Sequence, residues 1–247
     1  MWSLLCYQAQ QVSQRDAPPV GGFGVLFFIK VWRLRFASVS GAPLTVTLGI
    51  TISMQTYMNQ LSLNYKHKGI PYGGFGESRD DGDANYGFKD LKGNNSLIPE
   101  IPELKRDLSL MNLVRAIDAP QTGLLSIGCV SGDIEDEQGF RNTGYVEISI
   151  NSVSAITDAK NYFPLFFHFD RLLNSNNFSV KVHFDWELQP ATFIDAKASG
   201  FTCTIIVNTH YSKTKLEAEA SWSESLGVLG FFLGSVPREH HDLIYGQ

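Results

Sequence analysis

Hydrophobic and polar residues alternate without a break from residue 178 to residue 188. Successive side chains of a strand point to opposite faces of a sheet, so this pattern predicts a strand with one buried and one solvated face. A second alternating stretch covers 201–210, and the two stretches are expected to pair as an antiparallel hairpin. Their apolar faces coincide when His183 lies opposite Asn208.

The rest of the C-terminal part predicts a similar hairpin and three helices. Leu125, Ile127 and Cys129 alternate in one predicted strand, and a second strand runs through 146–150. The spacing of apolar residues predicts helices at 104–117, 164–173 and 213–235. The start of the last helix also fits a strand, because apolar residues alternate there, but the length of the pattern favours a helix.

These elements predict an α+β fold, in which an antiparallel sheet carries helices on one face. Their order is α-ββα-ββα, with two ββα units in tandem. The patterns of the two units superpose with Ile127 on Val182 and with Val146 on Phe201. Few identities accompany the match, so it indicates a repeated architecture.

The first 65 residues are interpreted as an N-terminal arm or leader outside this fold. Asp16 is the only acidic residue among the first 76, although the chain has 25 Asp and Glu residues. Such a composition is typical of an organellar transit peptide. It also fits an upstream extension, with Met54 or Met58 as the true initiator. A genuine arm is the third interpretation, and the alternation at 44–52 supports it by predicting an edge strand.

The remaining boundaries follow from composition. Residues 66–103 are rich in Gly, Asp and Asn and predict a long loop or a linker. The α+β domain is expected to span 104–237. Residues 238–247 are expected to form a polar tail.

Charge and cysteine content narrow the possible partners and compartments. The net charge of −5 argues against nucleic acid, because binding to phosphate requires concentrated Lys and Arg. The longest apolar run, 20–29, is too short to span a membrane. Three cysteines fit no disulfide framework, which favours a cytoplasmic protein; an organelle is the alternative if the N-terminus is a transit peptide.

One polar cluster on the open face of the predicted sheet is a candidate metal site. The predicted pairing makes His210 the diagonal neighbour of His183, with Asp185 on the same face. Two imidazoles and a carboxylate can hold a metal ion. The simpler interpretation is that polar residues fill the solvated face of an antiparallel sheet.

Other motifs do not meet the requirements of their chemistry, so no cofactor is predicted. The acidic stretch 81–85 begins like a calcium loop, but Tyr86 and Lys92 occupy the positions that need Gly and Glu. The glycines of 73–76 match neither dinucleotide-binding nor P-loop spacing. The sequence contains no Gly-x-Ser-x-Gly motif.

Two functional hypotheses follow. The first is a non-enzymatic protein-binding domain that acts as a homo-oligomer, because the helix at 162–173 is apolar on nearly all sides and needs a second cover. A homodimer through apolar helices is the simplest such assembly. The second hypothesis is a small hydrolase or metal-dependent enzyme centred on His183, Asp185 and His210.

Overall fold

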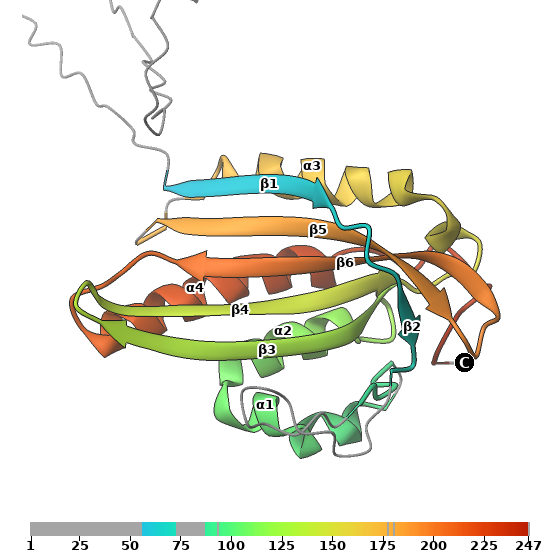
Figure 1. Ribbon diagram of the computed structural model, residues 1–247, viewed down its shortest axis with the longest axis horizontal. Helices are drawn as coiled ribbons and strands as arrows, with labels where there is room; N and C mark the ends of the chain where they lie inside the picture. Colours follow the sequence, from blue (N-terminus) through green and yellow to red (C-terminus); the bar gives the residue numbers. More distant parts are fainter. Residues whose placement is uncertain (1–55, 73–86, 93, 177, 180, 247) are drawn as a thin grey trace, which may run out of the picture. The chain divides into compact units, whose positions relative to one another are not determined.

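A computed structural model describes residues 56–72, 87–92, 94–176, 178–179 and 181–246, and among them six strands form one sheet (Figure 1). The strand order is β1-β5-β6-β4-β3, and β2 also pairs with β5. The strands are β1 (Tyr57–Leu63), β2 (Lys68–Ile70), β3 (Leu124–Asp136), β4 (Gly139–Ile150), β5 (Val182–Phe193) and β6 (Ala198–Thr209).

The sheet is mixed, although the sequence predicts a purely antiparallel one. β3 with β4, β4 with β6, and β5 with β6 are antiparallel pairs. β1 and β2 run parallel to β5. Both precede the first hairpin in the chain, and the sequence pattern does not predict their pairing with a strand so far along the sequence. The β5–β6 register sets His183 opposite Asn208, so this predicted pairing is confirmed.

Helices cover one face of the sheet. The four α-helices are α1 (Pro102–Arg106), α2 (Leu108–Ile117), α3 (Phe163–Leu173) and α4 (Lys215–Gly234). Short 3-10 segments η1 (Asn95–Glu100), η2 (Ala155–Thr157) and η3 (Ala159–Tyr162) precede α1 and α3. Among the described residues, no helix is both long and apolar enough to cross a lipid bilayer.

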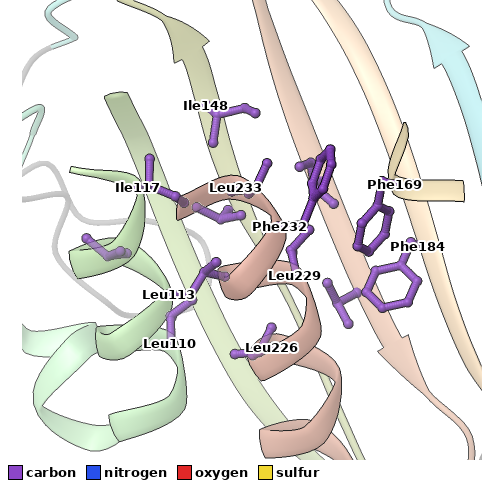
Figure 2. Close-up of a cluster of buried hydrophobic side chains, with 14 of the residues drawn as sticks. Leu110, Leu113, Ile117, Ile148, Phe169, Phe184, Leu226, Leu229, Phe232 and Leu233 are labelled. Atoms are coloured by element: carbon purple, nitrogen blue, oxygen red, sulfur yellow. The ribbon is translucent and has the colours of Figure 1, made fainter. Parts of the chain in front are cut away.

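The main core lies between these helices and the sheet. Leu226, Leu229 and Leu233 of α4 lie between the apolar side of α2 and the aromatic residues near α3 (Figure 2). Phe169 of α3 packs against Phe184 of β5, with ring centroids 5.0 Å apart. The alternation in β5 therefore places its apolar residues in the core, as predicted.

Capping side chains set where α2 and α4 begin. The predicted helix at 104–117 is divided into α1 and α2 at Asp107, whose extended backbone ends one helix while its carboxylate accepts from the Leu110 amide. The other Asp107 oxygen accepts from Trp222 Nε1 at 2.6 Å and so ties α2 to α4. A reciprocal capping box between Thr214 and Glu217 starts α4 as a helix.

A bulge in β3 changes which face its residues occupy. The register shifts between Ser126 and Gly128, so β3 advances by two residues where β4 advances by one. Leu125 and Ile127 consequently join a second core with Phe193, whereas Cys129 packs against the main core. The prediction that these three β3 residues share one face is wrong, because the extra residue interrupts the period of two.

Segments assigned by sequence to an arm, a loop and a tail pack with the sheet. The compact unit begins at Thr56, so it includes β1. Leu91 and Ile98, from the 66–103 segment, are buried in the main core. Near the C-terminus, the side chain of Asn151 donates to Tyr245 O at 2.9 Å and accepts from the Tyr245 amide.

Candidate functional site

The predicted polar cluster is only partly brought together. His183 and Asp185 lie half-buried on the face of β5 that does not carry the helices. The Asp185 carboxylate accepts a hydrogen bond from Gln60 of the neighbouring β1. This neighbour does not follow from the sequence pattern, which predicts no strand at β1.

The third member of the predicted cluster lies outside the strand. β6 ends at Thr209, so His210 is exposed, and its amide donates to Lys181 O at 2.8 Å. Its ring meets the edge of the Tyr211 ring, with centroids 6.3 Å apart. Among the described residues, no three His, Cys, Asp or Glu side chains lie close enough to share a metal ion.

Other candidate residues do not form a catalytic arrangement. His168 is exposed on α3, and Asp170 accepts from Asn59 Nδ2 at 3.3 Å. Burial raises the pKa of the Cys129 thiol to about 12, so the reactive thiolate is scarce at neutral pH. The glycine-rich stretch 73–76, the acidic stretch 81–85 and the predicted strand at 44–52 lie outside the described residues.

From Asn59 to Leu63, the outer edge of β1 pairs with no strand of the part of the chain that the structure describes. Asn64 N donates to Leu188 O and Val182 N donates to Thr56 O, so even-numbered residues direct their backbone groups toward β5. Backbone groups of alternate residues point to opposite sides of a strand. Asn59, Leu61 and Leu63 therefore direct theirs outward, and no described strand pairs with that edge.

Aromatic side chains are exposed on the helix that covers this strand. Phe167 of α3 has 62% of its surface exposed, and Phe163, one turn earlier, has 36%. The opposite side of α3 packs on the sheet, where Phe166 meets Trp186 edge to face. In Figure 1, α3 lies behind the edge of the sheet that β1 forms. We call Phe163, Phe167 and the outer edge of β1 the α3–β1 surface.

A groove follows the other side of α3, where it faces α4. Its volume is about 410 Å³, and Leu172, Gly227, Val228 and Phe231 contribute to its walls. Phe231 is 73% exposed at this groove. Ser175, Asn176, Ser223 and Glu224 supply the polar part of the same groove, so Phe231 is an exposed aromatic ring in mixed surroundings.

The sequence pattern indicates the helix of this surface but not its strand. The apolar character of 162–173 predicts an uncovered helical face, and the exposure of Phe163 and Phe167 agrees with it. The pattern misses β1 because Asn59 interrupts the alternation of Tyr57, Leu61 and Leu63. These apolar residues at odd positions are the available signal.

Comparison of the chain with protein-family models, with curated proteins and with solved structures finds no match. The function is therefore inferred from the geometry of the surfaces. The α3–β1 surface presents exposed aromatic rings and the outward backbone groups of Asn59, Leu61 and Leu63.

Proposed function

We propose that this chain is a protein-interaction domain that forms a homodimer through the α3–β1 surface. The observation that carries the proposal is the exposure of Phe167 beside a strand whose outer edge pairs with no described strand. Exposed aromatic patches and open strand edges are both uncommon on proteins that stay monomeric.

A two-fold axis at β1 uses both features at once. Antiparallel pairing of β1 with β1 of a second copy extends the sheet across the dimer. Because α3 covers this edge of the sheet, the same axis brings the two α3 helices side by side. Phe167 lies near the middle of α3, so each copy of Phe167 meets the aromatic residues of the other.

The sequence of β1 favours a second copy as the occupant. None of its seven residues is charged, so antiparallel self-pairing sets no like charges opposite each other. Isologous association requires a surface that is complementary to itself, and an uncharged strand edge meets this requirement.

The experiment is light scattering on the full chain across a range of concentrations. The wild-type protein is expected to be a dimer, and Phe167→Asp is expected to weaken association about 100-fold, because a carboxylate would be buried against aromatic rings. The matched control is Leu216→Asp, a 75% exposed residue in the first turn of α4, where an acidic side chain suits the helix.

Two results would contradict the proposal. One is a wild-type monomer at all concentrations, which would mean that the edge is covered within the chain, for example by the strand predicted at 44–52. The other is a dimer that Phe167→Asp and Leu216→Asp weaken equally. A circular dichroism spectrum of each variant confirms that it is folded.

A further inference from the structure

A cavity of about 500 Å³ lies beside β3, away from the α3–β1 surface. Its walls come from β2 and the residues after it, from the described segment 87–91, from α1, and from β3 and β4 at the bulge. This volume is within the range of small-molecule sites in proteins.

The bulge of β3 shapes this cavity. Tyr72 Oη donates to the carbonyl oxygen of Ile127, the extra residue, at 2.9 Å. A Cβ atom on Gly128 would lie 2.8 Å from the same hydroxyl, so the absence of a side chain at Gly128 lets Tyr72 approach. The Tyr72 ring is thereby fixed as one wall.

A buried ion pair lies in the wall of the cavity. Glu147 of β4 is only 5% exposed, and its Oε1 lies 2.5 Å from Lys68 Nζ of β2. The Lys68 ammonium therefore already neutralises this buried carboxylate.

A second pair of opposite charges lines the same cavity. Lys89, which is exposed, and Glu103, which is half-buried, both line it, and neither forms an ion pair or a side-chain hydrogen bond with the described residues. Beside the Lys68–Glu147 pair, the cavity therefore carries one further ammonium and one further carboxylate group, together with the aliphatic side chains of Leu91, Ile101 and Ile127.

We infer that this cavity binds a small zwitterion with an aliphatic side chain, namely a free amino acid or a dipeptide. Its ammonium group pairs with Glu103, and its carboxylate pairs with Lys89. A ligand with one charge would leave Glu103 or Lys89 without a counter-ion, and an uncharged ligand would leave both without one. The aliphatic residues contact the ligand's side chain.

Calorimetric titration of the full chain tests the inference with four probes: leucine, leucyl-leucine, leucinamide and 4-methylpentanoate. Leucine or leucyl-leucine is expected to bind, and whichever binds more tightly identifies a free amino acid or a dipeptide as the ligand. Leucinamide lacks the carboxylate and 4-methylpentanoate lacks the ammonium group, so each is expected to bind at least about tenfold more weakly.

Variants assign each charge to its partner. Lys89→Gln should weaken leucine binding about tenfold and leave leucinamide unaffected, whereas Glu103→Gln should weaken leucine binding and leave 4-methylpentanoate unaffected. Lys105→Gln, an exposed α1 residue outside the cavity, is the matched control. The inference is overturned if neither zwitterion binds at millimolar concentration, if the singly charged probes bind as tightly, or if both cavity variants bind leucine like the control.

Discussion

At one edge of the sheet, β1 presents seven residues without a charge, whereas at the other edge β3 carries Asp133, Glu135 and Asp136 along its second half. Side chains from outside the strand also contact the acidic residues of β3. Lys215 of α4 pairs with Asp133 at 3.2 Å, and the Tyr211 hydroxyl donates to Asp136. Neither edge pairs with a further strand within the described ranges, but only β3 carries charges that oppose a new strand.

The first half of β3 is protected in a different way. The bulge at Ser126–Gly128 breaks the regular spacing of its backbone groups, and the Tyr72 hydroxyl donates a hydrogen bond to the Ile127 carbonyl oxygen. Natural sheets use charges and bulges to prevent pairing between edges. β3 has both, and β1 has neither. From this difference we expect association at β1. The charges and the bulge of β3 are expected to prevent pairing of a new strand with the β3 edge.

The largest effect on stability is expected from Lys92, whose side chain links the segment before α1 to the start of β3 by hydrogen bonds. Its side chain is 4% exposed, and Nζ lies within hydrogen-bond distance of five oxygen atoms, among them Leu124 O at 2.6 Å. Burial lowers the pKa of Lys92 to about 8, so the ammonium form still dominates at pH 7.

Lys92→Met should lower the free energy of unfolding by about 3–5 kcal/mol, because buried carbonyl oxygens lose their donor and Asp118 loses a nearby positive charge. Urea denaturation at one protein concentration measures the change. Lys105→Met, exposed on α1, should change stability by less than about 0.5 kcal/mol. Equal stability of the two variants would show that Lys92 does not hold the edge closed.

Two glycines test how tightly β3 is packed on β4. A Cβ atom on Gly144 would lie 2.9 Å from Ser131 Cα and still closer to Val130 O, so backbone atoms would have to move. Gly144→Ala should therefore destabilise the protein by about 3 kcal/mol in urea denaturation. A Cβ atom on Gly132 would have no heavy atom within 4 Å, and Gly132→Ala should change stability by less than about 1 kcal/mol.

The sequence predicts the central hairpin better than either edge. The β5–β6 register follows from alternation alone, because one face of each strand is buried. In β3 the bulge reverses the faces after Ser126, and nothing in the local alternation marks the extra residue. Lys92 is separated by more than 20 residues from the oxygens it binds, so its role depends on tertiary packing.

The α3–β1 surface also combines a feature that the local sequence predicts with one that depends on tertiary contacts. The apolar helix predicts an uncovered face, which depends on local composition. The open edge of β1 depends on its parallel pairing with β5, a contact between segments more than 100 residues apart. The predicted cluster of His183, Asp185 and His210 has the right register, but Gln60 of β1 and the end of β6 change the surroundings of its members.

Stability should depend on pH through Asp118, the carboxylate that anchors the start of β3. Burial raises its pKa to about 6, an effect partly offset by hydrogen bonds from Ser126. The folded state therefore keeps a proton that the unfolded state releases near pH 4, and this contribution to stability is lost as pH rises toward 6.

The loss should amount to about 2 kcal/mol, and urea denaturation between pH 4 and pH 7 measures it. Asp118→Asn can still accept from the Ser126 amide and cannot ionise, so the difference between wild type and variant should shift by this amount across the interval. A constant difference would mean that Asp118 ionises equally in both states. β1 has no ionisable carboxylate or amine, so no comparable dependence is expected from that edge.

The smallest effect comes from placing one charge on either edge. Met58→Lys adds a charge to β1 at a residue that is 39% exposed, and it should weaken the dimer about tenfold, since a charged side chain on a strand edge opposes pairing with a new strand. Glu135→Lys changes the charge on exposed β3 and should leave association unchanged. Light scattering of both variants distinguishes the edges. Weaker association in Glu135→Lys alone would place the interface at β3 and reverse the comparison.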